Sequence, residues 1–348
     1  MRPPLRELTL GRDLARDAIP ESEQAFLEAL GGPALLRLAG QDHARTRIVS
    51  TLLHGNEPSG LRAVHGYLRS DAIPATDVLF FIGAVGTALA EPRFGHRALP
   101  GEVDANRCWR APFESAPGRV AKQALARFRE SGAECLVDLH NNTGHNPAYG
   151  VAFEIGHAEQ SLVSLFADRV VHTPLELGTL VEATIRSFPS VTIECGRAGD
   201  PAADRVAAEG LERYLDWQTI DFTRPVVPLM ILESPVRVCV REGLDLAFAD
   251  APDPAAPLTV SRSIDRHNFE RMAPGSAIGW VGEGAPWPIA AVDADGLECS
   301  RHYFEISEGV LRTREAFIPI MMTTNREIAK SDCLFYAVQP AVAALPSG

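Results

Sequence analysis

Residues 46–60 read TRIVSTLLHGNEPSG, and this stretch decides the fold. The run at 46–53 is a candidate for a buried strand, and it ends abruptly in the polar loop at 54–60. Residues 61–68 then place apolar side chains at helical spacing, and the run VLFFIGAV at 78–85 is apolar throughout. The stretch and its continuation therefore predict a β-loop-α-β unit.

The same order of elements recurs twice further along the chain. GRVAKQALARFRES at 118–131 has the pattern of an amphipathic helix, and CLVDLH at 135–140 that of a strand that leads into the polar loop at 141–144. A third strand is predicted at 190–196, and a helix follows it through Trp217. Strands with helices between them indicate an α/β protein with a mostly parallel central sheet flanked by helices.

The texture of the sequence changes towards the C-terminus. Short β-like runs at 236–240, 277–281 and 317–322 are separated by Gly, Pro and Asp. A chain of 348 residues also exceeds what one hydrophobic core usually serves. We therefore expect a catalytic domain at 1–225 and a smaller β-rich domain at 226–348.

Charge and cysteine content exclude several classes of protein. The 33 Lys and Arg against 45 Asp and Glu give a formal net charge of -12, and an acidic surface repels nucleic-acid phosphates. The six cysteines form no close pair and no CxxC, which argues against both a disulfide framework and a cysteine zinc cluster. The N-terminus lacks the apolar core of a secretory signal, and no stretch approaches the ~20 apolar residues of a membrane span. We expect a cytoplasmic protein that binds neither nucleic acid nor membrane; a homo-oligomer stays open.

Three predicted strands lead into residues that bind metals or carry protons, namely His54, His140 and Glu194. In an open parallel sheet, ligands bind beyond the carboxyl ends of the strands. Catalytic zinc takes three protein ligands and leaves a fourth position to water, and His54, Glu57 and His140 meet that count. The His-x-x-Glu spacing lets one loop present an imidazole and a carboxylate to the same ion. Glu194 is then the candidate general base that takes a proton from water and returns it to the leaving amine.

Each of these residues alone has an ordinary structural interpretation. A histidine near a strand end is most often hydrogen-bonded packing. Glu57 precedes a predicted helix, where a carboxylate suits the dipole, and Glu194 could be the buried partner of an arginine. The hypothesis of a metal centre therefore depends on the set of four residues and not on any one of them.

Four motifs carry a resemblance to a known family: HGNE at 54–57, DANR at 104–107, DLHNNTG at 138–144 and TIECG at 192–196. Together they resemble the succinylglutamate desuccinylase/aspartoacylase family, which is related to the zinc carboxypeptidases. They fall in the family's order over roughly residues 45–200, and DLHNNT is most similar to the aspartoacylase side.

The resemblance implies hydrolysis of the amide bond of an N-acyl amino acid, with one zinc ion on His54, Glu57 and His140 and with Glu194 as the base. It further implies substrate-facing residues. Asn106 and Arg107 match the pair that grips a substrate carboxylate, and Arg suits this task because its planar fork binds carboxylates in bidentate fashion. Arg186 resembles the arginine that holds a second substrate carboxylate.

Two further residues are candidates near the reacting group. Arg97 resembles the family's arginine that stabilises the carbonyl oxygen during amide hydrolysis, and Arg93 is close enough in sequence to compete with it. Asn141 either orients substrate or forms a turn. Arg97 and Arg186 could equally be surface cations in ion pairs worth under ~1 kcal/mol.

The chain departs from the family around its DANR motif, where Trp109 and Arg110 could alter the acyl pocket. Two other functions use the same residues: a zinc carboxypeptidase that trims peptides, and a non-catalytic protein that binds metal or carboxylate. The second would be expected to lack a ligand or the base, and all four key residues are present.

Overall fold

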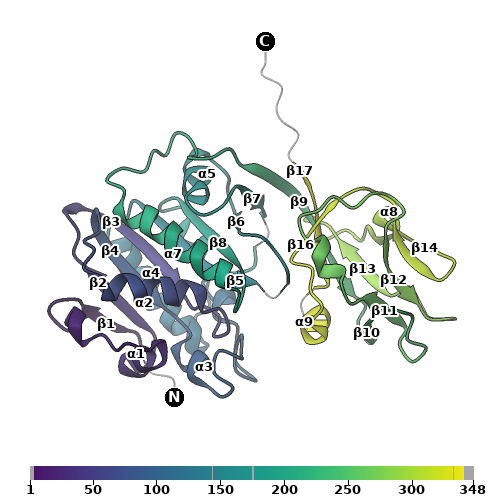
Figure 1. The fold of residues 1–348 in the computed structure, drawn as a ribbon, viewed down its shortest axis with the longest axis horizontal. Coiled ribbons are helices and arrows are strands. Elements are labelled where there is room, and N and C mark those ends of the chain that lie inside the picture. The colour runs from purple at the N-terminus through teal and green to yellow at the C-terminus, as the bar shows by residue number, and fades with distance from the viewer. Residues whose placement is uncertain (1–3, 143, 175, 332, 341–348) are drawn as a thin grey trace, which may run out of the picture. The chain divides into compact units, whose positions relative to one another are not determined.

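The computed structural model describes residues 4–142, 144–174, 176–331 and 333–340 (Figure 1). The chain forms two compact units, one made of Met1–Asn141 with Ala148–Met230 and the other of Asn142–Pro147 with Ile231–Gly348. The second unit therefore includes a short peptide from the middle of the chain as well as the C-terminal part.

The first unit contains a central sheet with strand order β1-β2-β4-β3-β5-β8-β6-β7. The strands are β1 (Arg6–Thr9), β2 (Ala34–Leu38), β3 (Asp42–Thr51), β4 (Thr76–Ile82), β5 (Cys135–Asn142), β6 (Tyr149–Ala152), β7 (Arg169–His172) and β8 (Ser190–Arg197). The central strand β3 is parallel to both β4 and β5, whereas β2 pairs with β4 and β6 pairs with β8 in antiparallel fashion. The predicted α/β class with a central sheet flanked by helices is confirmed.

Helices cover both faces of this sheet. They are α1 (Glu23–Leu30), α2 (Ser59–Arg69), α3 (Val85–Leu89), α4 (Ala116–Glu130), α5 (His157–Ser164), α6 (Leu180–Thr184) and α7 (Pro201–Asp216). Neighbouring residues of a strand point to opposite faces, and β3 shows the result: Ile48 packs with Phe128 of α4, whereas Arg47 bonds to carbonyls of Tyr214 and Trp217 at the end of α7. Helix α7 packs beside α2, and Figure 1 shows the two lying side by side.

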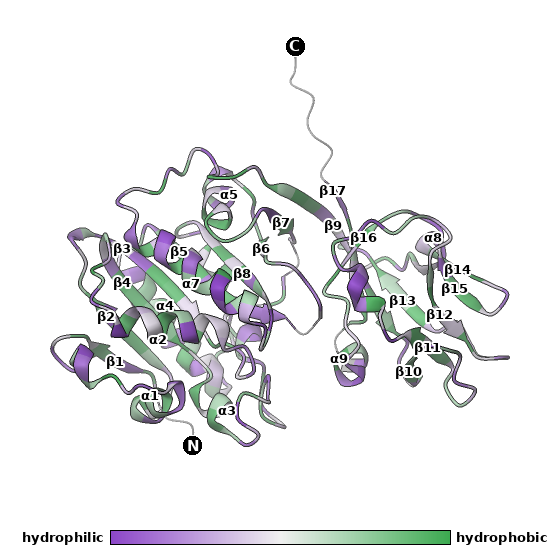
Figure 2. Ribbon diagram, viewed as in Figure 1, coloured by the Kyte–Doolittle hydropathy of each residue, from purple (hydrophilic) through white to green (hydrophobic). Residues whose placement is uncertain are grey.

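Between these helices the central strands carry buried hydrophobic side chains, such as Ile48 and Val49 of β3 and Val78–Ile82 of β4. In Figure 2, α2 and α7 carry hydrophobic and hydrophilic stretches in alternation. This is the pattern expected of helices that pack one face on a buried sheet. No helix among the described residues is both long and apolar enough to cross a membrane.

The second unit is rich in β-structure. Four of its strands pair in the order β13-β9-β17-β16, namely β9 (Met230–Val240), β13 (Ile289–Val292), β16 (Ile318–Ile320) and β17 (Phe335–Pro340). A separate sheet has the order β10-β11-β12-β15-β14. The strands of the latter are Leu246–Ala249, Leu258–Ser261, Ala277–Val281, Val310–Thr313 and, for β14, Phe304–Ser307. The short helices α8 (Ser300–Tyr303) and α9 (Arg326–Ser331) accompany them, and one apolar cluster that includes Phe304, Phe317 and Phe335 fills the unit.

Candidate metal centre

The loop between β3 and α2 carries two of the candidate ligands. Strand β3 ends at Thr51, and Leu52 has a φ of 56°, a left-handed conformation that bulky residues rarely adopt and that turns the chain out of the sheet. Gly55 packs so closely on α3 that an added Cβ would lie 2.7 Å from Thr87 Cγ2, so only glycine fits there. The Gly55 N–H donates to the carbonyl of Arg97 at 3.2 Å, which fixes the loop against a distant segment.

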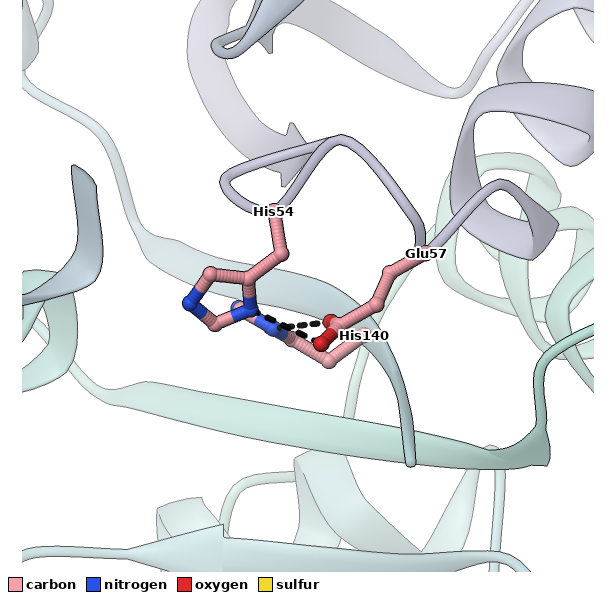
Figure 3. Close-up of side chains that lie close together, drawn as sticks. All are labelled: His54, Glu57 and His140. Carbon is pink, nitrogen blue, oxygen red and sulfur yellow. Dashed lines mark hydrogen bonds and ion pairs between the residues drawn. The ribbon is translucent and has the colours of Figure 1, made fainter. Parts of the chain in front are cut away.

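His54, Glu57 and His140 converge at the edge of the sheet (Figure 3). The Nδ1 atoms of His54 and His140 lie 2.9 Å and 2.8 Å from the two oxygens of the Glu57 carboxylate, and the ring centroids are 5.0 Å apart. All three side chains are buried, and one ligand atom from each lies within 4.8 Å of the others. The structure thus brings the three predicted ligands together.

Each histidine is oriented by a second carboxylate. His54 Nε2 lies 3.0 Å from Asp104 Oδ1, and His140 Nε2 lies 2.8 Å from Asp138 Oδ2. A carboxylate only accepts hydrogen bonds, so each Nε2 donates to its carboxylate, and Nδ1 is the nitrogen left to carry the lone pair when a ring loses its second proton. This is the arrangement in which a histidine presents one nitrogen to a metal while a carboxylate holds the other.

The donor set fits a divalent metal ion. Both Nδ1 atoms face oxygens of Glu57, and a nitrogen lone pair and a carboxylate oxygen at such distances repel unless a proton or a metal ion lies between them. His54 Nδ1 is buried and, although close to Glu57, makes no hydrogen bond among the described residues. Two imidazoles and one carboxylate that leave room for a further ligand are the donors of a catalytic zinc site.

Electrostatics keep the Glu57 carboxylate ionised. Burial alone would raise the pKa of Glu57, but the neighbouring His54 and His140 outweigh it and hold that pKa well below its usual range. For Asp104, burial likewise opposes ionisation, and His54, Arg97 and Arg107 overcome it so that its pKa also lies well below the ordinary value. The centre therefore offers charged carboxylates in a buried position, which favours the binding of a cation.

Glu194 has the opposite electrostatic character. It lies on β8, and the antiparallel register places the fully buried Tyr149 of β6 directly opposite, on the same face of the sheet. Burial, and then the charge of Glu57, raise the pKa of Glu194 to about 8. Its Oε2 makes no hydrogen bond among the described residues. A buried carboxylate with a pKa near neutrality can both accept and return a proton.

The structure distinguishes Arg97 from Arg93. The Arg97 guanidinium lies 3.5 Å from Glu57 Oε1 and 2.9 Å from Asp104 Oδ2, and its side chain is 40% exposed. Arg93 instead pairs with Glu91 at 3.0 Å and bonds to Gln24. Arg97 is therefore the arginine that contacts the candidate centre.

Asn106 and Arg107 lie beside the centre, in the short 3₁₀ helix Ala105–Arg107. The buried Asn106 side chain accepts a hydrogen bond from the backbone of Leu180 at 3.0 Å and so anchors the start of α6. Arg107 donates to the carbonyl of Asn106 at 2.9 Å, and its charge acts on Asp104. Asn106 thus holds the backbone that carries Arg107, and only the arginine keeps side-chain exposure for a ligand.

The remaining expectations have different outcomes. Arg186 is exposed in the turn after α6 and makes no hydrogen bond or ion pair among the described residues. Both polar atoms of the Asn141 carboxamide form hydrogen bonds within the protein, to Ser59 and Gly196. Trp109, which was expected near the acyl pocket, is buried against Phe81 and Phe128 in the core under α4.

Asp104 and Asp138, the two carboxylates that orient the histidines, are not among the predicted site residues. Both lie inside quoted motifs. Asp138 stands two residues before His140, and residues i and i+2 of a strand share a face, so its position next to the ring was available from the sequence. Asp104 approaches His54 from a segment 50 residues away, and no local pattern indicates that contact.

We expect Asp138→Asn to weaken metal binding about 10- to 100-fold, the usual effect of losing a carboxylate behind a ligating histidine. The amide cannot stabilise a cationic centre, although it keeps the shape of the fully buried Asp138. Zinc affinity measured by competition with a chromophoric chelator checks this. Asp77→Asn is the matched control, because Asp77 pairs with the exposed His43 at 2.8 Å away from the centre. Equal affinities for both variants would contradict the orienting role.

Comparisons with known proteins support the fold. No protein-family model matches the sequence, and no curated protein is significantly similar to it. Solved structures do match: succinylglutamate desuccinylase from Vibrio parahaemolyticus has a TM-score of 0.58 at 14% identity, covering 92% of this chain and 95% of that one. A succinylglutamate desuccinylase/aspartoacylase from Rhodobacter sphaeroides gives 0.57 at 15% identity, with 88% of each chain covered.

A third similar structure comes from the aspartoacylase side. An aspartoacylase family protein from Mesorhizobium loti has a TM-score of 0.52 at 13% identity, and the match covers 88% of this chain and 89% of that one. The matches span nearly the whole chain, so they include both compact units. At these identities the likeness concerns the architecture. The chain has the fold of the succinylglutamate desuccinylase/aspartoacylase proteins, as its four motifs predicted.

Proposed function

We propose that this protein is a zinc-dependent amidohydrolase that cleaves the amide bond of an N-acyl amino acid. The observation that carries the proposal is the buried group of His54, Glu57 and His140 next to Glu194. The shared fold supports it, because the similar structures are named as desuccinylases and aspartoacylases, which act on such amides. One zinc ion per chain would be held by the two imidazoles and the carboxylate.

A bound zinc ion supplies a Lewis acid that lowers the pKa of a water molecule and polarises the amide carbonyl. Glu194 then takes the proton from the attacking water and delivers it to the leaving nitrogen, a task that its raised pKa suits. Arg97 keeps part of its guanidinium exposed beside Glu57 and stabilises the charge that develops on the carbonyl oxygen.

Substrate binding at this centre is assigned to Arg107. Arg107, held by Asn106, binds the carboxylate of the amino acid through its planar fork. A role for Arg186 in holding a second carboxylate rests on its motif alone, because Arg186 stands before the amino end of β8 and no contact among the described residues joins it to the centre.

The test couples metal analysis to product release. Metal per chain is measured by elemental analysis, and amine release is followed for a panel of N-acetyl, N-succinyl and N-formyl amino acids with and without chelator. Release that the chelator abolishes and zinc restores would support the proposal. One zinc per chain without release from any member would refute the proposed substrate class, and absence of metal would refute the mechanism.

The raised pKa of Glu194 predicts a pH-dependent stability of the metal-free protein. An unfolded Glu titrates near ~4.3, whereas folded Glu194 titrates at about 8. The folded state therefore binds the proton more tightly, so this stabilisation is complete at acidic pH and is lost as the pH rises through 8. We expect the Tm of the wild type to fall relative to that of Glu194→Gln between pH 5 and pH 9 in chelator, roughly the window between these two pKa values. Parallel Tm profiles would contradict it.

A further inference from the structure

The Asn141 carboxamide joins separate segments of the candidate centre. Its Oδ1 accepts from the backbone N–H of Ser59 at 3.0 Å, and its Nδ2 donates to Ser59 Oγ at 2.9 Å and to the carbonyl of Gly196 at 3.0 Å. Ser59 stands two residues after Glu57, and Gly196 stands two residues after Glu194. One buried side chain thus links the loop of a proposed metal ligand to the strand of the proposed base.

Asn141 also contacts the ligand itself. Its backbone N–H lies 3.2 Å from Glu57 Oε2, the same oxygen that His140 Nδ1 approaches to 2.8 Å. Asn141 is the next residue after His140 on β5 and is 2% exposed. Any rotation of the Asn141 peptide would therefore move both the hydrogen bond to Glu57 and the ring of His140.

A chain of hydrogen bonds continues from Asn141 to the protein surface. Ser59 Oγ donates to Asp204 Oδ1 on α7 at 2.6 Å, and Arg62 Nη1 donates to Asp204 Oδ2 at 3.0 Å. Arg62 also reaches Glu23 of α1 at 3.1 Å. Exposure rises along this chain, from none for Ser59 to about a third of the side chain for Asp204 and Arg62.

Asp204 determines which atoms donate and which accept in this series of hydrogen bonds. A carboxylate accepts hydrogen bonds only, so the single hydroxyl proton of Ser59 is committed to Asp204. Ser59 Oγ must then accept from its other neighbour, which places the NH₂ group and not the oxygen of Asn141 against it. The remaining Nδ2 proton is directed at Gly196, and Oδ1 at the Ser59 backbone. The backbone groups of Ser59 and Gly196 fix which way the Asn141 amide faces, and the Ser59 hydroxyl holds it at a third point. Removing the acceptor at residue 204 frees the Ser59 hydroxyl to rotate, and this third hydrogen bond to Asn141 is weakened.

We propose that Asp204 and Ser59 are positioning residues, which through Asn141 hold Glu57, His140 and Glu194 in the geometry that binds metal. Neither residue touches the proposed ion or substrate. The effect on catalysis rests on the proposed function, whereas the effect on metal affinity is measured without substrate.

The experiment compares Asp204→Ala with Asp204→Asn. The asparagine keeps an oxygen that accepts from Ser59, and the alanine does not. Zinc affinity is measured by chelator competition, the visible spectrum of the cobalt-substituted protein reports ligand geometry, and the Tm of the metal-free protein reports folding. Arg62→Gln is the matched control, since it removes the ion pairs of Asp204 but leaves the Ser59 hydrogen bond.

We expect Asp204→Ala to weaken zinc binding about 10-fold, at the lower end of effects from residues behind a ligand. Its cobalt bands should shift, and kcat should fall with an unchanged KM. Asp204→Asn and Arg62→Gln should keep wild-type zinc affinity and spectrum. Ser59→Ala should show the same loss of zinc affinity and the same shift of the cobalt bands as Asp204→Ala. If Ser59→Ala does not fold, the comparison of Asp204→Ala with Asp204→Asn alone tests the proposal.

Equal zinc affinity and equal cobalt spectra for Asp204→Ala and Asp204→Asn, with a difference in Tm alone, would overturn the proposal and leave Asp204 a purely structural residue. That result, in a wild type that binds zinc and releases amine, would leave the proposed function standing. A wild type that binds no zinc would instead remove the proposed function and, with it, any role of this chain of bonds in metal binding.

Discussion

Glu194→Gln is expected to lower kcat by about 10³-fold or more while the protein keeps its full complement of zinc, since general acid-base groups typically contribute 10²–10⁴-fold. The amide has the shape of the carboxylate but can neither accept the proton from water nor return it to the amine. Glu194 does not belong to the group of His54, Glu57 and His140 whose ligand atoms converge, so metal binding should survive. Steady-state kinetics on the best substrate of the panel, with zinc per chain measured on the same sample, check both parts.

The control for Glu194→Gln is Glu159→Gln. Glu159 is also a buried glutamate, 7% exposed, but it accepts from the backbone N–H of Gly156 at the start of α5, away from the centre. The amide oxygen of Gln can still accept that bond, so kcat should stay near the wild-type value. Normal turnover by Glu194→Gln would exclude Glu194 as the base.

His140→Ala is expected to reduce bound zinc from one per chain to a small fraction, with affinity lowered roughly 100-fold or more, because one of the three ligands is lost. The substitution also leaves Glu57 and Asp138 as buried carboxylates without their imidazole. Breaking a buried charged pair costs about 3–5 kcal/mol, so the Tm should fall as well. Elemental analysis after gel filtration, together with a thermal melt, measures the two effects separately.

A control must separate ligand loss from the loss of any buried histidine. His65→Ala serves this purpose, because His65 is 6% exposed, stacks on Phe26 and bonds to the carbonyl of Pro20 at 2.8 Å. It should lower the Tm but leave zinc at one per chain. Full zinc occupancy in folded His140→Ala would take His140 out of the ligand set.

Sequence patterns predicted the longer strands and helices of the first unit. The expected strand at 190–196 corresponds to β8 and the helix at 118–131 to α4, within a residue or two. The expected strand at 46–53 ends two residues early, at Thr51, because Leu52 takes a left-handed conformation that no composition rule reveals. Short strands such as β6 and β7 have only four residues each and give too little periodicity to detect.

In the candidate centre, too, some residues could be predicted from the sequence and others could not. His54, Glu57 and His140 were identifiable because a single strand-loop junction and the neighbouring strand bring them together. The contact of Asp104 with His54 and that of Asp204 with Ser59 span 50 and 145 residues, and they exist only because the sheet and helices are assembled first. Long-range hydrogen bonds of this kind decide orientation, and a single sequence carries no local signal for them.

The second unit is built from two segments that are far apart in the sequence, and this limits the order in which the chain can fold. Asn142–Pro147 belongs to that unit although Asn142 is the last residue of β5, and Asn146 accepts a hydrogen bond from the backbone N–H of Met321, 175 residues further along. Contacts between such distant residues close large loops and form slowly. During synthesis, Asn142–Pro147 can therefore form its contacts within the second unit only after the C-terminal part of the chain has been made. In a protein truncated at Met230, Asn142–Pro147 would lack its partners. Residues 231–348 therefore do not form a complete unit that could be replaced by another domain.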